Sequence, residues 1–566
     1  MTETSLHNKT NKKTYRIFLI VLFLLSLFMV WWTGPVSDYG GHDYFFHLRR
    51  FNVLVDALRD GEYPIYLDYE NIGGYGYFTK IFYPDLILLP FALLSLLTGV
   101  GAAYNVMLFI MTFLCGIFTY KLISTIFSNS PAAFSGALLY TFSAYRLFDL
   151  YQRGALGEAL SFTFLPLVLL GLFYIISGDY RKWYVLAAGY SLVIYTHVLS
   201  SFMVFVLLFI LCAISYKSFR KEPVRLGYLL LAAIVTVGFT ASYIFPMLEQ
   251  MASNTFYYEN QPNITGQNKL GAHRILWGGF VSGFLYPQNS PSCGVGLLLT
   301  ISACLRIFIK EKSNYLKIAD GCLIIGGVTF LIIMSSVFPW GGRLPLGFIQ
   351  FPSRFYLLVS MMFAIAGSYY LSALLKSKSR QAAGSVILVI FTIAVIILSN
   401  KYYTEGQIKA RASNSNETTD KPIIGNWYNL GWLEYLPEKV PSIYYLTDRG
   451  DSITALNEST SISDFQRKGR TLKFSVTSSA DTLELPPLTY YKGYKAFKDR
   501  QPLVLQESQN GLVEIAIRGG NGRVNVFYEW TFVQEISLYI SLICIFVLIT
   551  YIFVWKRKAK KQIPKE

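Results

Sequence analysis

The sequence has few charged side chains and few of the residues that bind metals. Charged residues make up 15 % of its 566 residues, hydrophobic residues make up 53 %, and only 5 residues are His. No Cys-x-x-Cys pair occurs, so no zinc knuckle or disulfide framework can be recognised. Most of such an apolar chain has to be solvated by lipid, which predicts a polytopic α-helical membrane protein. The Cys are then simplest to explain as packing residues: Cys115, Cys212, Cys293, Cys304, Cys322 and Cys544.

Acidic residues are also scarce relative to basic ones, with 34 Asp and Glu against 50 Lys and Arg. The net charge of +16 gives little support to nucleic-acid binding, because the basic residues form short clusters between apolar runs. Such clusters orient membrane helices by staying on the cytoplasmic side. The first apolar run follows Lys12, Lys13 and Arg16 and ends without a small-x-small cleavage pattern. We therefore expect an uncleaved first helix and a cytoplasmic N-terminus.

Thirteen apolar segments are long enough to cross or enter a bilayer, given the ~17–25 residues of a spanning helix. If all of them crossed, the basic tail at 556–561 would lie outside the cell, against the usual orientation rule. We therefore expect about 12–13 membrane segments, a cytoplasmic C-terminus, and one segment that enters without crossing. The candidates are 81–99, which contains Asp85 and Pro90, and 183–197. The segments are 17–33, 81–99, 101–121, 131–147, 158–177, 183–197, 201–216, 226–247, 294–309, 318–338, 354–375, 382–400 and 535–555.

The stretch at 401–534 differs from the rest, because it is polar and then shows short alternating apolar runs. The period-two pattern at 471–476, 512–517 and 523–528 is typical of strands. We expect a small β-rich extracytoplasmic domain here. The other expected divisions are a transmembrane domain at 1–400, with a first outer loop and interfacial helix at 34–80, and a last transmembrane helix with a basic cytoplasmic tail at 535–566.

The end of the first membrane helix is crowded with ionisable residues. Asp38, His42, Asp43, His47 and Arg50 lie in one short stretch that leads into a predicted amphipathic helix. Ionisable groups at a membrane boundary are costly to desolvate, so they indicate either a substrate site or an anchor for an interfacial helix. A carboxylate there can act as a general base. A metal pair of Asp and His is a third interpretation, although no third ligand stands at a recognisable spacing.

A second charged group lies on the same predicted outer face and contains Arg146, Asp149, Arg153 and Glu158. Asp149 and Arg153 have the i,i+4 spacing of a helical ion pair. Glu158 suits the positive N-terminal end of the following helix. These residues either neutralise one another or hold an acceptor hydroxyl or a cation.

Arg343 and Arg354 border a predicted outer loop that precedes another apolar helix. Positive charge on the outer face runs against the orientation rule, so both residues call for an anionic partner such as a lipid phosphate. Contact with bulk lipid headgroups explains Arg343 equally well, whereas Arg354 is flanked by Pro352 and Phe355. His197 lies between two apolar runs and is either structural or part of the same site.

Several short motifs together resemble the GT-C superfamily of membrane glycosyltransferases. They are Gly41-His-Asp-Tyr-Phe-Phe-His-Leu-Arg-Arg50, Tyr145-Arg146 with Gly154-Ala-Leu-Gly-Glu158, Thr196-His197, and Phe351-Pro-Ser-Arg-Phe355. More narrowly, the chain resembles the bacterial YfhO-like proteins and the membrane proteins labelled 6-pyruvoyl-tetrahydropterin synthase related, over nearly its whole length. That label does not imply pterin chemistry, because the catalytic Cys and zinc-binding His cluster of the soluble enzyme have no counterpart in the sequence.

The resemblance implies a GT-C-like transmembrane domain and an enzyme, an inverting glycosyltransferase. It would move a sugar from a polyprenyl-phosphate donor to an envelope polymer or glycolipid on the outer face of the cell membrane. Asp43 aligns with the loop carboxylate that acts as general base, and Arg354 is expected to bind the donor phosphate. The predicted substrate-binding residues are Asp38, His42, His47, Arg50, Arg146, Asp149, Arg153, Glu158, His197, Arg343 and Arg354.

The Asp-x-Asp spacing of the oligosaccharyltransferases is missing, so we expect no metal ligands and no required cofactor, and a divalent cation stays the open alternative. The expected partners are the donor, the acceptor and membrane lipids, without nucleic acid. Two other functions stay open. A lipid-linked oligosaccharide transporter would explain the many spans, although no inverted repeat is evident. An inactive scaffold for envelope polysaccharide synthesis would leave the envelope sugar content unchanged on deletion.

Overall fold

The computed structural model describes residues 3–32, 43–260, 294–334, 337–338, 340, 347–414, 433–455 and 460–561. They fold into two compact units, and each unit combines stretches that are far apart in the sequence. Unit 1 takes its described residues from 1–47, 87–236 and 263–418. Unit 2 takes them from 48–86, 237–262 and 419–566.

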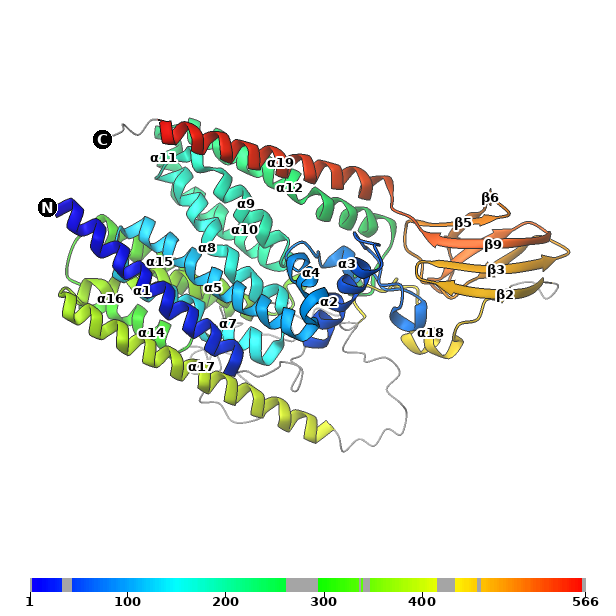
Figure 1. Cartoon of the computed structure of the whole chain (residues 1–566), viewed down its shortest axis with the longest axis horizontal. Coiled ribbons are helices and arrows are strands. Elements are labelled where there is room, and N and C mark those ends of the chain that lie inside the picture. The colour runs from blue at the N-terminus through cyan, green and yellow to red at the C-terminus, as the bar shows by residue number, and fades with distance from the viewer. Residues whose placement is uncertain are drawn as a thin grey trace. The chain divides into compact units, whose positions relative to one another are not determined.

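Unit 1 consists of packed helices (Figure 1). Side-chain caps fix two of the helix starts, since Asn129 Oδ1 accepts from the N–H of Ala132 and Ser313 Oγ accepts from the N–H of Leu316. The elements are α1 (Glu3–Trp32), α4 (Leu89–Thr98), α5 (Val100–Phe127), α6 (Ser130–Thr141), α7 (Ala144–Phe148), η3 (Asp149–Arg153), α8 (Leu156–Ile176), η4 (Tyr180–Lys182), α9 (Tyr184–Ile194), α10 (Val198–Ile214), α11 (Tyr216–Lys221), α14 (Leu297–Cys304), η7 (Leu305–Phe308), α15 (Asn314–Ile333), η8 (Gly347–Ile349), η9 (Pro352–Phe355), α16 (Tyr356–Leu374) and α17 (Lys378–Asn414).

Small residues let the helices of unit 1 approach one another closely. A Cβ on Gly171 of α8 would lie 2.2 Å from the backbone nitrogen of Leu186 in α9. A Cβ on Gly189 of α9 would lie 2.9 Å from the backbone nitrogen of Val168. Close backbone approach is how helices gain packing energy in lipid, where the surrounding chains are as apolar as the side chains.

The prediction of a helical membrane protein is confirmed. Each of the thirteen apolar segments contains a helix, and eight helices of the described chain are long and apolar enough to cross a membrane. The two segments suspected of incomplete crossing contain α4, with 10 residues, and α9, with 11 residues. At 1.5 Å per residue, such helices reach about half of a ~30 Å hydrocarbon layer. Pro90 stands in the first turn of α4, where a proline is tolerated.

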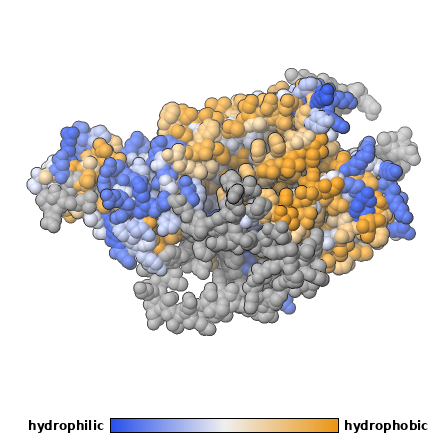
Figure 2. Space-filling model, turned by 180° about the vertical axis from the view of Figure 1, so that it is seen from behind, coloured by the Kyte–Doolittle hydropathy of each residue, from blue (hydrophilic) through white to orange (hydrophobic). Residues whose placement is uncertain are grey.

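The outer surfaces of these helices are apolar. Figure 2 shows hydrophobic residues over much of the helical surface in view. Large hydrophobic side chains such as Phe209 of α10 and Ile390 of α17 are more than half exposed. Exposed apolar area of this extent indicates contact with lipid rather than with water.

Unit 2 contains the predicted β-rich domain, which is confirmed as a pair of antiparallel sheets. One sheet has the strand order β1-β4-β8-β7 and the other β2-β3-β9-β5-β6. The predicted strands correspond to β3, β8 and β9, and β8 and β9 belong to different sheets although they are neighbours in sequence. The strands are β1 (Thr454–Ala455), β2 (Thr460–Lys468), β3 (Thr471–Ser478), β4 (Thr482–Leu485), β5 (Tyr494–Lys498), β6 (Gln501–Pro502), β7 (Val504–Glu507), β8 (Val513–Ile517) and β9 (Gly520–Tyr528).

The alternating residues of both sheets share one hydrophobic core. Phe474 of β3, Ile515 of β8 and Val526 of β9 are fully buried in it. Phe78 joins this core from the 48–86 stretch and stacks on Tyr491 with ring centroids 4.2 Å apart. Burial of such aromatic rings explains why 48–86 belongs to unit 2.

The remaining elements of unit 2 are helical. The first half of α12 belongs to unit 1 and its second half to unit 2, where Ser541 of α19 inserts its hydroxyl between the C=O of Gly238 and the N–H of Ser242. α17 continues to Asn414, past residue 400, where the sequence placed the start of the outer domain. The elements are α2 (Tyr44–Arg59), which begins in unit 1, η2 (Asn71–Gly74), α3 (Thr79–Phe82), α12 (Val224–Ser253), η5 (Tyr257–Asn260), α18 (Ile443–Arg449) and α19 (Phe532–Lys561).

Candidate functional site

Arg153 is the centre of a group of charged side chains in unit 1. Its Nη1 lies 2.7 Å from Glu158 Oε2 and 3.1 Å from Asp149 Oδ1. Its Nη2 lies 3.7 Å from Asp43 Oδ2. The structure therefore brings together Asp43, Asp149, Arg153 and Glu158, which the sequence placed in two separate stretches.

The local backbone explains how Arg153 reaches Asp43. Residues 149–153 form a π-helical turn, a rare conformation that is frequent at functional sites. The turn ends at Gly154, whose φ of +64° suits glycine, and a Cβ there would lie 2.8 Å from Tyr44 Cβ. This close approach allows the N–H of Asp43 to donate to the C=O of Arg153 at 2.7 Å.

Glu158 is a buried carboxylate that two arginines share. It lies in the first turn of α8 and is 1 % exposed. Besides Arg153, it contacts Arg354 Nε at 3.5 Å and accepts a hydrogen bond of 2.7 Å from the hydroxyl of Tyr145. The N-terminal end of a helix also favours negative charge at this position.

Arg354 is held just before α16. Its Nη1 donates to the C=O of Ile349 at 2.8 Å and to Gln350 Oε1 at 3.0 Å. Its guanidinium carbon lies 5.3 Å from the centre of the Phe351 ring, and that of Arg153 lies 5.5 Å from the same ring. Within the described residues, Arg354 Nη2 has no hydrogen-bond partner. One donor of a fixed guanidinium is thus left for another acceptor.

Asp43 is the accessible member of the group. Its carboxylate is 39 % exposed, whereas those of Asp149 and Glu158 are buried. It immediately precedes α2, and its C=O accepts the N–H of His47. An exposed carboxylate beside buried guanidinium groups can accept a proton from a molecule that binds at the protein surface.

His197 caps α10 and lies near Glu158. Its Nδ1 lies 2.9 Å from Ser200 Oγ and accepts from the N–H of Ser200. Gly157 permits this position, because a Cβ there would lie 2.9 Å from the C=O of Thr196 and 3.5 Å from His197 Cβ. His197 therefore caps α10 and also lies close to the charged group.

Asp149 is fully buried outside the long membrane helices. Burial raises the pKa of its carboxyl well above the usual range, and the nearby charge of Glu158 adds to this rise. Its Oδ2 has no hydrogen-bond partner among the described residues. Burial therefore favours the protonated form of Asp149, and its contact with Arg153 opposes this effect.

The family comparison gives a match for residues 81–404, to the family described as 6-pyruvoyl-tetrahydropterin synthase related domain; membrane protein. The chain belongs to this family. It is also 24 % identical over 612 aligned positions to an uncharacterized protein of Lactococcus lactis subsp. cremoris (strain MG1363), covering 98 % of this chain and 97 % of the relative. No solved structure matches. Membership of this family, predicted from the sequence, is confirmed, whereas GT-C membership stays a prediction.

The 6-pyruvoyl-tetrahydropterin synthase related match contains most of the charged group. Arg153, Glu158, His197 and Arg354 lie inside the matched region. Asp43 precedes it, and the β-sandwich follows it. The buried part of the group thus belongs to the segment that defines the family model.

Other predicted residues lie elsewhere. Arg146 is buried in unit 1 and donates to the C=O of Thr141 and to Thr112 Oγ1. The ring of His47 is buried with its centroid 5.2 Å from that of Phe46. Asp38, His42 and Arg343 lie outside the described residues.

Arg50 belongs to a second buried group, in unit 2, which sequence reasoning missed. Lys80 Nζ lies 2.9 Å from Asp85 and donates to the C=O of Arg50 at 2.6 Å. Arg50 Nη2 donates to the C=O groups of Tyr83 and Pro84 and lies 3.9 Å from Asp85. The available signal was a Lys and an Asp flanking the apolar run 81–84, since charges beside such a run need a partner.

Sequence reasoning missed two further features: two aromatic residues that contact the charged group of unit 1, and a small cleft in unit 2. Tyr145 and Phe351 stood inside the quoted motifs but were not assigned roles.

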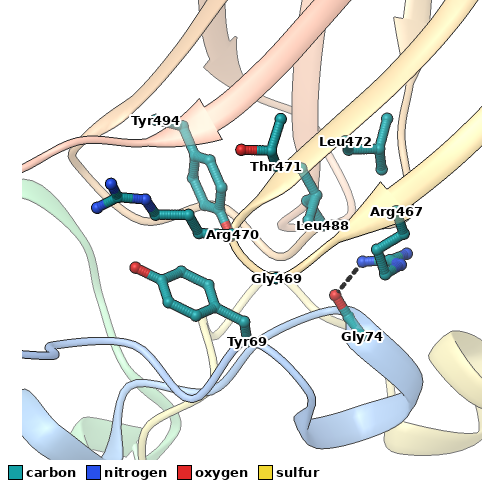
Figure 3. Close-up of a pocket in the computed structure, with 9 residues that line it drawn as sticks. All are labelled: Tyr69, Gly74, Arg467, Gly469, Arg470, Thr471, Leu472, Leu488 and Tyr494. Carbon is teal, nitrogen blue, oxygen red and sulfur yellow. Dashed lines mark hydrogen bonds between the residues drawn. The ribbon is translucent and has the colours of Figure 1, made fainter. Parts of the chain in front are cut away.

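Figure 3 shows a small cleft of unit 2, where Arg467 donates to the C=O of Gly74 and the φ of Gly74 is +93°. The cleft has room for about one water molecule, so it joins the 48–86 stretch to β2 and β3 rather than holding a substrate. The described residues contain no group of three His, Cys, Asp or Glu side chains suited to a metal ion.

Proposed function

We propose that this membrane protein is an inverting glycosyltransferase. It transfers a sugar from a polyprenyl-phosphate donor to a hydroxyl of an envelope polymer or glycolipid on the outer face of the membrane. The observation that carries the proposal is the accessible carboxylate of Asp43, 3.7 Å from Arg153, which shares Glu158 with Arg354. The transfer is a direct displacement by the acceptor hydroxyl, so it does not require an enzyme side chain that forms an acyl or phosphoryl intermediate.

The proposed reaction uses one carboxylate and two cations. Asp43 accepts the proton of the acceptor hydroxyl as its oxygen attacks the anomeric carbon of the donor sugar. The bond from that carbon to the phosphate oxygen breaks, and polyprenyl phosphate leaves with the electron pair. Direct displacement inverts the anomeric configuration. Guanidinium groups held in advance stabilise the charge that develops on the departing phosphate.

Arg354 is the better of the two arginines for the phosphate. Two contacts of its Nη1 hold it in place, and its Nη2 has no partner among the described residues. Arg153 is occupied by Asp149 and Glu158 and lies nearer to Asp43. Arg354 is thus assigned to the phosphate, and Arg153 positions Asp43. A planar guanidinium can donate hydrogen bonds to two oxygens of one phosphate at the same time.

The orientation of the site follows from the positive-inside rule and belongs to the proposal. Glu158, His197 and Arg354 stand at the N-terminal ends of α8, α10 and α16 or just before them, so these ends lie at one face of unit 1. We place this face outside and both chain termini in the cytoplasm. In a chain whose six native Cys are replaced by Ser, Asp56→Cys is expected to react with a membrane-impermeant maleimide on intact cells. Reaction only after permeabilisation would contradict this orientation.

Proteoliposomes that contain the protein and a labelled polyprenyl-phosphate sugar test the reaction. A transferase releases polyprenyl phosphate in amounts equal to the sugar that is added to an envelope acceptor. A transporter would move the labelled donor across the bilayer without consuming it. Intact donor that stays on its own side would favour an inactive scaffold. The last two outcomes contradict the proposal.

A further inference from the structure

The five-stranded sheet of unit 2 has a groove on the face that points away from the core. The groove has a volume of about 540 Å³, which is within the range of small-molecule sites. It lies on the solvent-facing side of β3 and β9, and the alternate residues of these strands are buried in the core of the sandwich. Its lining consists of Lys473, Phe497, Asp499, Arg500, Arg523 and Asn525.

Strand register places these residues side by side. Asn525 of β9 is the cross-strand partner of Lys473 on one side and of Phe497 on the other. A cation, an amide and an aromatic ring therefore form one row across three strands, in which neighbouring residues are directly opposite one another. Arg523 stands two residues from Asn525, on the same face of β9.

The groove is basic, and its cations are not neutralised by the protein. Within the described residues, Lys473, Arg500 and Arg523 form no ion pair. Asp499 is the one carboxylate of the lining, and its Oδ1 accepts the N–H of Arg523 at 3.0 Å. Asn525 Oδ1 has no hydrogen-bond partner in the described part of the chain. The groove thus presents three cations and one carboxylate. Its aromatic ring lies beside Asn525, whose amide oxygen is buried, and Arg523 Nη2 donates to Gln466 Oε1 at 3.4 Å.

The turn at the edge of the groove is held in a conformation that these residues rarely adopt. Asp499 and Arg500 join β5 to β6 with φ values of 48° and 73°, where Asn and Gly are usual. Gly522 makes room for the turn, since a Cβ there would lie 2.3 Å from Asp499 Oδ2. Backbone strain of this kind is concentrated at functional sites. Here the turn brings Arg500 to the groove.

We propose that this groove binds an anionic polysaccharide, with the carboxylates or phosphates of the polymer on the three cations and one sugar ring on Phe497. A sugar ring presents an apolar C–H face and hydroxyl groups together, which matches an aromatic ring next to an amide. An acidic peptide would use the cations without needing Phe497. A membrane surface would call for more exposed apolar side chains than Phe497 and the neighbouring Phe527, whose ring centroids lie 5.9 Å apart.

Binding of fluorescent polygalacturonate to the full-length protein in zwitterionic nanodiscs tests this site. Neutral dextran and polyglutamate are the comparison polymers. We expect polygalacturonate to bind, with an affinity that falls as salt rises. Lys473→Gln and Arg500→Gly are each expected to weaken binding at least fivefold, and Phe497→Ala is expected to weaken it for polygalacturonate. Lys439→Gln is the control, because Lys439 pairs with Glu507 of the other sheet.

Arg500→Gly separates binding from folding. Glycine relieves the positive φ at this position, so the variant is expected to keep the sandwich folded, and thermal unfolding of the same sample checks this. Equal binding of polyglutamate would contradict the role of the sugar ring, and equal binding of dextran would contradict the role of the charges. Absence of polygalacturonate binding, or unchanged affinity in the groove variants, would overturn the proposal. Asp43→Asn is expected to bind the polymer normally, so this result is independent of the transferase reaction.

Discussion

Each unit buries a group of cations around a carboxylate, and the two groups differ in their surroundings. In unit 1, Glu158 lies between Arg153 and Arg354, and the partly exposed Asp43 lies at the edge of the group. In unit 2, Asp85 lies between Lys80 and Arg50, and further donors of both cations go to backbone C=O groups.

The difference indicates which group can do chemistry. All three side chains in the unit 2 group are less than a tenth exposed, and this group has no exposed carboxylate comparable with Asp43. The unit 1 group keeps a carboxylate in contact with solvent and a guanidinium donor without a partner in the described chain. Access, more than the kinds of charged residue, therefore separates a candidate active site from a structural ion cluster.

The largest expected loss of stability is similar for the two groups. Glu158→Gln and Asp85→Asn each remove a buried carboxylate. Among the described residues, the first leaves Arg354 without an ion-pair partner, and the second leaves both Lys80 and Arg50 without one. Breaking a buried pair in this way costs about 3–5 kcal/mol. Denaturant unfolding of the two variants in detergent micelles measures the loss. A cost below about 1 kcal/mol for either variant would show that its cations find other partners.

Arg354→Lys and Arg50→Lys sharpen the comparison. Lysine keeps the charge but loses the planar donors, so Arg354→Lys is expected to raise the KM for the lipid donor about tenfold. Arg50→Lys in the closed group is expected to leave the KM unchanged. Donor titrations of the two variants test this contrast. Equal effects on KM would remove the functional distinction between the groups.

The pH dependence of stability tests the state of Asp149. Because its folded pKa is raised, its contribution to stability is fully present below the ordinary carboxyl pKa and is lost as the pH rises toward the folded value. Asp149→Asn resembles the protonated acid and does not titrate. The variant should therefore gain stability relative to the natural chain between pH 5 and pH 9. A difference that stays constant over this range would mean that Asp149 is already ionised at pH 5.

The smallest expected effect concerns unit 2 alone. Arg500→Gly removes a positive φ from a residue with a side chain, which should stabilise the sandwich by about 0.5–1 kcal/mol. Sugar transfer should not change, because Arg500 does not belong to the unit 1 group. Thermal unfolding and a transfer assay on the same sample give both values. A loss of stability would indicate that the contacts of the Arg500 guanidinium stabilise the sandwich by more than the positive φ of Arg500 destabilises it.

Local patterns predicted the helices and one ion pair. Long apolar runs identified the helices because a bilayer requires them, and i,i+4 spacing predicted the contact of Asp149 with Arg153. The outer sheets followed from period-two alternation, but their pairing did not, since β8 and β9 separate into different sheets.

Contacts between distant residues could not be predicted from spacing. Glu158 meets Arg354 only because α8 and α16 begin at the same face, and no local signal encodes that packing. Arg50 stands close to Asp43 in sequence, yet α2 carries the two residues into different units. The sequence indicated Asp43, Arg153 and Arg354 as site residues, whereas the contacts of the structure add Tyr145 to the same group.

The most direct test of the proposed base is the single-turnover rate of sugar transfer by Asp43→Asn, with Asp56→Asn as the matched control. Asp56 lies on the same helix, is half exposed and pairs only with Arg59 among the described residues. A general base contributes about 10²–10⁴-fold, so Asp43→Asn should lose transfer by that factor and unfold at the same temperature as the natural chain. Asp56→Asn should transfer normally. A transfer rate of Asp43→Asn within a few fold of the natural rate would contradict the account.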